Sequence, residues 1–394
     1  MPTAPGRLVV ATGFEQRLRR GMWESVPVRS HAFVPNPLPP SFSDAQRGQV
    51  LSEVVAAQTA LIRLEGLLRG MPDPHALLGP MLKREAKYSS KIENTTASIR
   101  EIALVEANMP APRPEVAEVR NNLLALQHGI NSPLPLCLRL MREMHAVLLL
   151  GVDDTKQPGH FRASQVHIRG VEPGLETARF VPAPPGDEMQ SCLNSFEKFL
   201  NRKADPGSPI EFPVELALVH YQFECIHPFM DGNGRLGRLL IPLAGIKRGL
   251  VEFALPHVSR FLESNREEYC ELLLRVSTKG DWVSWIRFFC RAIVEDCTKN
   301  MVRVRRLADL REEYLQRVTG KKTSVLAQQL VDLLFVRHAV TTAIVSQELG
   351  ITTPPAQKHI DRLEKAKILR EITGGNYGRV WVAEDLVRLI EAED

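Results

Sequence analysis

Residues 227–238, His-Pro-Phe-Met-Asp-Gly-Asn-Gly-Arg-Leu-Gly-Arg, combine a base, a carboxylate, a Gly-Asn-Gly turn and two guanidinium groups. A protein that binds a nucleoside triphosphate and transfers part of it needs groups of these kinds. Arginine side chains donate paired hydrogen bonds to phosphate oxygens. The backbone N–H groups of a glycine-rich turn bind anions, best where the turn begins a helix. The carboxylate of Asp231 can hold Mg²⁺ against phosphates, and the imidazole of His227 can accept a proton from an attacking hydroxyl.

The composition is that of a globular protein. A chain of 394 residues has room for two or three domains. Its net charge of +4 is too small to indicate a nucleic-acid or membrane partner. No apolar run approaches the roughly 18 residues that span a membrane. Residues 1–10 contain no long apolar stretch that ends in a small-residue cleavage site. The six cysteines are scattered without a C-x-x-C pair, so we expect reduced thiols and a cytoplasmic protein.

Prolines and apolar spacing indicate a mainly α core. Residues 1–45 are rich in proline and are expected to form an extended arm on a domain. Ser43 and Asp44 can cap a helix that continues to about Arg69, and Pro80 should delay the next helix to about Leu82. Further helices are expected at 115–130, 135–150, 187–203, 211–226, 235–249, 259–275 and 281–317. Alternation and prolines between them, at 155–186, predict one β-hairpin.

The C-terminal residues differ in pattern from the core. Helices are expected at 324–336, 341–350 and 353–367, followed by two short strands within 371–383. Helix, helix-turn-helix and hairpin form the order of a winged helix. Residues 320–394 contain ten basic and ten acidic side chains, whereas a DNA reader usually has a basic surface. DNA binding, protein contact and dimerisation therefore all stay open. Candidates to enter a DNA groove are Gln357, Lys358 and Arg362, and Arg379 is a candidate for the wing.

Residues 227–238 resemble the signature of the Fic family, His-Pro-Phe-x-Asp/Glu-Gly-Asn-Gly-Arg-x-x-Arg, and fill each of its defined positions. The resemblance implies a Fic-type helical core with a β-hairpin flap. It also implies transfer of AMP from ATP to a Ser, Thr or Tyr hydroxyl of a target protein, with self-modification left open. The expected division is an N-terminal arm and helical region with an inhibitory helix at 1–110, a Fic core at 111–300, a linker or helix at 301–322 and a winged helix at 323–394.

The resemblance gives roles to the middle of the signature. It implies that His227 is the general base and that Asp231 coordinates Mg²⁺. It places the α-phosphate on Asn233 and on the backbone of Gly232 and Gly234. Taken alone, the histidine could be an ordinary loop residue, the aspartate could cap the next helix, and the glycines could form a plain turn.

The two arginines of the signature are three residues apart and therefore share a helix face. The family places Arg235 near the β-phosphate and Arg238 near the γ-phosphate. From spacing alone, they could equally form a solvated basic stripe. Phe229 is expected to anchor the loop in the core on either interpretation.

A second motif resembles the family's inhibitory pattern Ser/Thr-x-x-x-Glu-Gly/Asn. It is filled by Ser89, Glu93 and Asn94 and lies N-terminal to the signature. The resemblance implies that Glu93 pairs with Arg238 and takes the place of the γ-phosphate, which would prevent productive ATP binding. Without the signature, Glu93 would be an ordinary surface carboxylate on a helix.

Family members also use the flap to hold the backbone of a target by strand addition. The candidates for this contact are Val166, His167, Ile168, Phe180 and Val181. An ordinary surface hairpin is the alternative. His145 and His220 are expected on helices, as structural core residues.

Three functions compete at this stage. The first is an ATP- and Mg²⁺-dependent protein adenylyltransferase inhibited by Glu93. The second is the reverse enzyme, which removes AMP with a water positioned by Glu93. The third is a regulator that senses nucleotide in its core and binds DNA through the winged helix. The target protein is unknown, a homodimer is left open, and no membrane partner is expected.

Overall fold

The computed structural model is mainly α-helical and describes residues 4–19, 22–152, 154–168, 174–203, 210–318, 325–375 and 377–392. Contacts group the chain into two compact units, which interleave along the sequence. Unit 1 comprises residues 1–61 and 124–295, and unit 2 comprises residues 62–123 and 296–394. The division falls within three helices, α1 (Asp44–Arg69), α4 (Pro114–Asn131) and α11 (Trp282–Val318).

Unit 1 is built around α7 (Phe212–Ile226) and α8 (Asn233–Lys247). Every residue from 213 to 226 is buried, which makes α7 the central helix of the core. The two helices approach closely at Gly237, where an added Cβ would lie 2.3 Å from Oε1 of Glu224. The other helices of this unit are α5 (Leu138–Leu148), η1 (Asp154–Lys156), α6 (Asp187–Leu200), α9 (Ser259–Ser264) and α10 (Arg266–Lys279).

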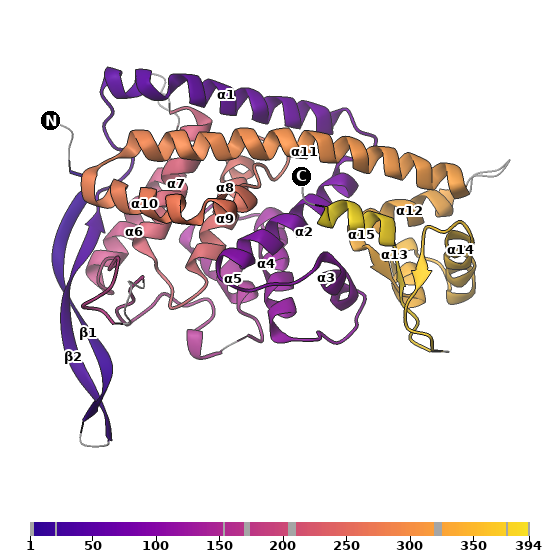
Figure 1. Cartoon of the computed structure of the whole chain (residues 1–394), viewed down its shortest axis with the longest axis horizontal. Coiled ribbons are helices and arrows are strands. Elements are labelled where there is room, and N and C mark those ends of the chain that lie inside the picture. The colour runs from indigo at the N-terminus through magenta and orange to yellow at the C-terminus, as the bar shows by residue number, and fades with distance from the viewer. Residues whose placement is uncertain are drawn as a thin grey trace. The chain divides into compact units, whose positions relative to one another are not determined.

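The N-terminal residues form a long antiparallel hairpin, β1 (Gly6–Arg19) with β2 (Met22–Pro35). Figure 1 shows this hairpin projecting beyond the helices of unit 1. Its inner face packs Ala11 and Val28 against Val181 of the flap region, and the N–H of Phe33 donates to the Val181 carbonyl at 2.8 Å. The arm is extended, as expected, but the pairing of its residues into a β-hairpin was not predicted.

Unit 2 contains α2 (Pro74–Ile92), α3 (Ile99–Glu106) and the C-terminal elements. These are α12 (Val325–Arg337), β3 (Ala339–Val340), α13 (Thr342–Leu349), α14 (Thr353–Lys365), β4 (Arg370–Glu371), β5 (Trp381–Val382) and α15 (Glu384–Glu391). The strands form a sheet in the order β3-β5-β4. The expected sequence of helix, helix-turn-helix and short strands is therefore present, and α13 ends at Gly350 in the left-handed conformation, with φ 62°.

Two expected helix boundaries are wrong. The second helix begins at Pro74 and continues through Pro80, because Gly79 has no Cβ to clash with the proline ring. The helix expected at 259–275 is divided into α9 and α10 at Asn265, whose φ of −119° is not helical. By contrast, the predicted start of α1 is confirmed: the Ser43 hydroxyl accepts from the N–H of Gln46 at 3.2 Å.

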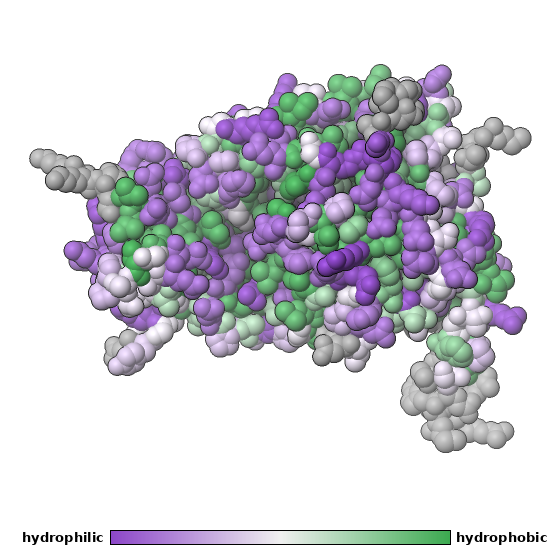
Figure 2. Space-filling view, turned by 180° about the vertical axis from the view of Figure 1, so that it is seen from behind, coloured by the Kyte–Doolittle hydropathy of each residue, from purple (hydrophilic) through white to green (hydrophobic). Residues whose placement is uncertain are grey.

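Within the described residues, no helix is both long and apolar enough to cross a membrane. On the face shown in Figure 2, hydrophobic residues are interspersed with hydrophilic ones. All six cysteines are free thiols.

Candidate active site

The signature forms the corner between α7 and α8. His227 ends α7 in the left-handed conformation, with φ 49°, and its N–H donates to the carbonyl of Phe223 at 2.9 Å. Gly232 begins α8 with φ 73°. The Asn233 side chain closes the loop between them, because its Oδ1 accepts from the N–H of Phe229 at 2.9 Å and its Nδ2 donates to the Phe229 carbonyl at 2.8 Å. Phe229 is fully buried, as expected for the anchor of the loop.

The hydrogen bonding of His227 indicates which ring nitrogen carries the proton. Its Nδ1 lies 3.1 Å from the backbone oxygen of Glu224. A carbonyl oxygen can only accept, so Nδ1 carries the proton and Nε2 keeps its lone pair. The Glu224 carboxylate lies 3.9 Å from the same Nδ1, where its charge would stabilise the imidazolium that forms when Nε2 is protonated. Sequence reasoning missed Glu224, although its position three residues before the histidine, at a helix end, was a usable signal.

His145 supports the loop from α5. Its Nε2 donates to the Asp231 carbonyl at 3.0 Å, and its Nδ1 accepts from the N–H of Gly159 at 2.9 Å. Its ring stacks on Phe229, with centroids 3.8 Å apart and an interplanar angle of 11°. Burial lowers the pKa of His145 to about 4, so the ring is neutral near pH 7. The residue is structural, as expected, but its contact with the signature was not apparent from the sequence.

Arg162 joins the signature loop to the flap. Its Nε donates to the His227 carbonyl at 2.9 Å, and its two terminal nitrogens donate to the Ser164 and Ala183 carbonyls. Its backbone N–H donates to the Pro228 carbonyl at 2.9 Å. Burial lowers the pKa of Arg162 to about 10. Sequence reasoning missed this residue, because its partners are backbone oxygens that no side-chain pattern reveals.

The structure brings the expected phosphate-binding groups together at the N-terminus of α8. Arg235 and Arg238 are buried, with 4% and 1% exposed, so they do not form a solvated stripe. No side chain caps the N-terminus of α8, and Gly234 lies in its first turn. Uncapped N–H groups and two buried cations favour an anion at this position.

Asp231 is the half-exposed carboxylate of this site. Its Oδ1 accepts from the N–H of Gly232 at 2.6 Å and lies 3.8 Å from Nη2 of Arg235. The described residues contain no cluster of three metal-binding side chains. A single carboxylate nevertheless fits Mg²⁺, which proteins often bind through one or two carboxylates together with substrate phosphates and water.

A cavity of about 370 Å³ is lined by Glu224, the residue whose carboxylate lies 3.9 Å from Nδ1 of His227. Glu224 lines it together with Ile168 and Phe180 of the flap. The other walls come from α7 and α10 and are mostly apolar, with a few polar groups, which is the usual character of a small-molecule site. Its full lining is Ile168, Arg179, Phe180, Tyr221, Glu224, Cys225, Arg266, Glu267, Cys270, Leu273, Leu274 and Ser277.

The expected flap is reduced to one antiparallel bridge among the described residues, between Ile168 and Phe180. The N–H of Ile168 donates to the Phe180 carbonyl at 2.8 Å. Val181 is buried under the β1–β2 hairpin, so its side chain anchors the flap and does not face a target. Val166 and His167 are half-buried and precede the bridge.

The inhibitory motif forms the end of α2, in unit 2. Glu93 is the C-cap residue, directly after the last helical residue Ile92, and is exposed, and Asn94 follows it with φ 62°. The N–H of Asn94 donates to the Lys91 carbonyl and that of Thr95 to the Ser90 carbonyl, both at 3.0 Å. These two bonds define a Schellman motif, whose left-handed position favours Gly or Asn. The last position of the pattern therefore has a local physical cause, and Ser89, at its start, is buried.

The chain is similar to proteins of one family. A model described as "Fic/DOC family N-terminal" matches residues 51–131, and a model described as "Fic/DOC family" matches residues 135–244. A protein adenylyltransferase Fic of Aedes aegypti is 30% identical over 222 residues, which is 54% of this chain and 39% of that protein. One of Nematostella vectensis is 31% identical over 226 residues, 55% of this chain and 46% of that protein. The chain thus spans less than half the length of these relatives.

Solved structures show the same fold. A Fic family protein from Desulfovibrio desulfuricans superposes with a TM-score of 0.53 at 19% identity, covering 88% of this chain and 98% of that one. Fic-1 from C. elegans superposes with a TM-score of 0.51 at 22% identity, covering 66% of this chain and 76% of that one. At these identities, the similarity concerns the fold alone.

Proposed function

Because the chain is a member of the Fic/DOC family, we propose that it is a protein adenylyltransferase that moves AMP from ATP to a Ser, Thr or Tyr hydroxyl of a target protein. The observation that carries this proposal is the hydrogen bond from Nδ1 of His227 to the Glu224 carbonyl, which puts the ring proton on Nδ1 and the lone pair on Nε2. The base stands at the start of a corner that leads to the uncapped N-terminus of α8 and its two buried arginines.

ATP binding follows from the charges of the corner. The first N–H groups of α8, at residues 233–235, favour the α-phosphate. Arg235 and Arg238 would neutralise the β- and γ-phosphates, because guanidinium groups pair well with phosphate oxygens. The adjacent cavity of about 370 Å³ has room for the base of the nucleotide. Asn233 contributes mainly by closing the loop, since its amide already bonds to both backbone atoms of Phe229.

The chemical step is an in-line displacement at the α-phosphorus. The target hydroxyl oxygen forms a bond to this phosphorus while the bond to the bridging oxygen of the β-phosphate breaks, and pyrophosphate leaves. The hydroxyl proton passes to Nε2 of His227, and the Glu224 carboxylate, 3.9 Å from Nδ1, stabilises the resulting imidazolium. Asp231 would hold Mg²⁺, which would neutralise phosphate charge.

The flap would present the target. Ile168 is exposed beside the cavity, and the bridge to Phe180 is very short, so a target segment can add backbone hydrogen bonds there. Arg162 ties this flap to the loop of His227, which would align the hydroxyl with the base.

Glu93 would inhibit the reaction by pairing with Arg238, because a carboxylate on that guanidinium removes a partner of the γ-phosphate. The support is the motif at the end of α2, whose Schellman geometry presents an exposed carboxylate. Removal of Glu93 should therefore increase AMP transfer.

The test is incubation of wild type, Glu93→Gly and Glu93→Gly/His227→Ala with α-labelled ATP, Mg²⁺ and a cell lysate. Label on protein with the single variant, and none with the double variant, would support an inhibited adenylyltransferase. Absence of label with both variants would contradict the proposed transfer from ATP. Loss of preattached AMP with wild type, but not with Glu93→Gly, would favour AMP removal instead.

The DNA-binding alternative gains no support from α14. The Gln357 side chain bonds to Thr342 and Asp361, and the Arg362 guanidinium donates to the Val318 carbonyl. These two groove candidates therefore make contacts within unit 2. We propose that the C-terminal elements contact protein, and Lys358 stays exposed on the same helix.

A further inference from the structure

The helix that carries the inhibitory motif packs on the C-terminal segment, defined as residues 325–392. Within unit 2, α2 lies against α12 and contacts α15. Gly79 marks the close approach, because an added Cβ would lie 3.1 Å from the carbonyl oxygen of Phe335. Most residues of α2 between 76 and 92 are buried.

Lys83 of α2 caps the C-terminus of α12. Its Nζ lies 2.7 Å from the Val336 carbonyl oxygen and 3.3 Å from that of Arg337. The last carbonyls of a helix have no partner within the helix and carry partial negative charge, so an ammonium stabilises them. The same Nζ lies 2.6 Å from Oε2 of Glu106, at the end of α3. Lys83 is 2% exposed, so this cation joins three helices in the interior.

Arg84, the next residue of α2, caps a second helix of the C-terminal segment. Its Nη1 donates to the carbonyls of Ile390 and Ala392, at 2.8 and 3.0 Å, at the end of α15. Two consecutive cations of α2 therefore satisfy the C-termini of both α12 and α15.

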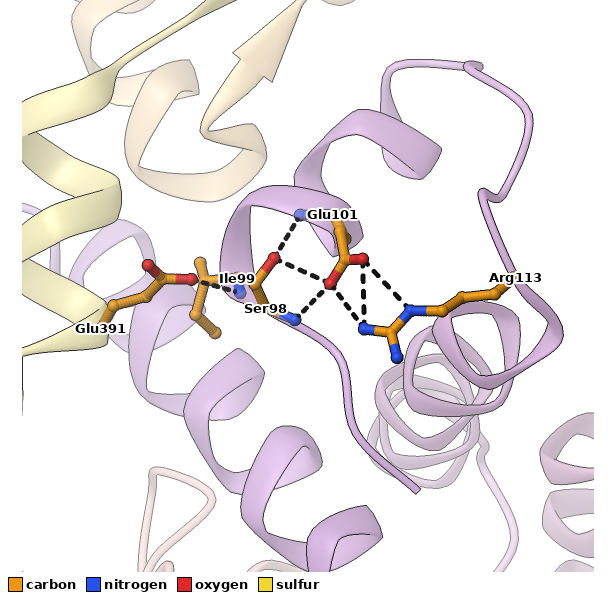
Figure 3. Close-up of polar contacts among 5 residues, drawn as sticks. All are labelled: Ser98, Ile99, Glu101, Arg113 and Glu391. Atoms are coloured by element: carbon orange, nitrogen blue, oxygen red, sulfur yellow. Dashed lines mark hydrogen bonds and ion pairs between the residues drawn. The ribbon is translucent and has the colours of Figure 1, made fainter. Parts of the chain in front are cut away.

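A carboxylate of the C-terminal segment makes a contact in the opposite sense, because it caps the N-terminus of a helix outside that segment. Figure 3 shows Oε1 of Glu391, on α15, accepting from the N–H of Ile99 at 2.8 Å. Ile99 is the first residue of α3, where Ser98 and Glu101 form a capping box. The N-terminus of α3 thus depends on α15, and the end of α3 depends on Lys83.

Removing one partner of a buried charged contact is costly, because the other partner is left without compensation. The helices α2, α3, α12 and α15 should therefore shift together. Building on the proposed inhibition by Glu93, we infer that the C-terminal segment is the regulatory element of this enzyme, which holds α2 in its inhibitory position through Lys83 and Arg84. A protein that displaces α12 or α15 would release Glu93 without touching the active site.

The geometry of α2 allows a displacement at Lys83 to move Glu93 directly. Lys83 lies within α2 and Glu93 is the C-cap of the same helix, ten positions further on, a separation of about 15 Å. A helix of this length moves as a stiff rod, so a loss of contacts at Lys83 displaces the end that carries Glu93. No separate hinge is required between the two positions.

The first experiment measures transfer of α-labelled AMP by wild type, Lys83→Met and Glu93→Gly. Methionine keeps the length of the side chain but removes the charge. We expect Lys83→Met to raise transfer about 5- to 150-fold, the range of typical coupling between sites, and Lys87→Met, one turn further on, to leave it near wild type. The double variant Glu93→Gly/Lys83→Met should equal Glu93→Gly, because Lys83 acts through Glu93.

Should Lys83→Met fail to fold, Glu391→Ala perturbs the same group of helices at a different contact, the one between α15 and the N–H of Ile99 in α3. It should raise transfer in the same direction. Wild-type rates in both folded variants, with Glu93→Gly active, would overturn the inference and leave the proposed function standing.

Hydrogen exchange keeps the two proposals separate, because it does not depend on catalysis. Lys83→Met should accelerate amide exchange in α2, α12 and α15 together, with α7 unchanged. Acceleration confined to α2 would overturn the inference. An inactive Glu93→Gly variant would count against the proposed function alone, and the exchange result would still decide the regulatory contact.

Discussion

The signature loop and the inhibitory end of α2 both leave a helix through a left-handed residue, His227 at φ 49° and Asn94 at φ 62°. The hydrogen bonds that the structure shows at the two ends differ. The signature loop is fixed by tertiary contacts from Asn233, His145 and Arg162. The end of α2 is fixed by two hydrogen bonds to its own last turn.

This difference suits the two proposed roles. A site that must orient ATP and a hydroxyl benefits from atoms fixed before the substrate binds. An inhibitor must be removable, and Glu93 is exposed at a locally formed helix end. The control of Glu93 is then best exerted further back along α2, at Lys83 and Arg84, and not at the motif itself.

The largest effect should come from Asn233→Ala, which removes both bonds that close the signature loop. The buried N–H and carbonyl of Phe229 would lose their partners, at a cost of about 1–3 kcal/mol for each group. In a Glu93→Gly background, we expect single-turnover transfer to fall by roughly a hundredfold, since small misplacements cost about that much. Asn233→Asp keeps the acceptor oxygen, so its transfer rate should lie between the rate with Asn233 and the rate with Asn233→Ala. A rate equal to that of Asn233 would show that the loop is held elsewhere.

A smaller effect is expected for His145→Ala, which removes one support of the Asp231 backbone. The loop keeps its bonds to Asn233 and Arg162, so we expect about a tenfold loss in kcat, equivalent to one typical hydrogen bond. The loss should appear in kcat with KM for ATP little changed, because the ring does not face the phosphates. His128→Ala, at an exposed histidine, is the control, and an equal loss there would contradict the assignment.

The neutral state of His145 also predicts a pH dependence of stability. Burial lowers its pKa to about 4 in the folded protein, whereas the unfolded value is near 6.5. Below pH 6.5 the unfolded chain gains a proton that the folded ring does not, so stability falls as the pH drops toward 4. Between pH 6.5 and 5.5, wild type should lose up to about 1 kcal/mol more than His145→Gln in urea unfolding. If the unfolding free energies of wild type and His145→Gln fell equally with pH, the His145 ring would not be the cause of the pH dependence.

Local patterns predicted much of the fold. Gly350, placed after an apolar helical period, predicted the end of α13, and the expected C-terminal elements are all present. Pro80 misled because its effect depends on the residue before it, Gly79. The β1–β2 hairpin was not predicted, because the prolines of this region indicate breaks in regular structure and do not indicate strand pairing.

The site divides in the same way. The contiguous signature predicted His227, Asp231 and the arginines as candidate site residues, because their spacing is fixed along the chain. Arg162 and His145 come from other elements and bind backbone oxygens of the loop. Such acceptors exist at every residue, so no sequence pattern marks them.

The smallest effect should come from Asn94, the counterpart of Asn233 at the inhibitory end. Asn94→Gly should leave both stability and inhibition close to wild type, since glycine adopts the left-handed conformation without strain. Asn94→Ala should cost about 1 kcal/mol, because alanine is strained there, and should raise AMP transfer only a few-fold as the helix end frays. Thermal unfolding and label transfer measure the two quantities. A large activation by Asn94→Ala, comparable with Glu93→Gly, would mean that the local cap and not the C-terminal segment determines where Glu93 lies.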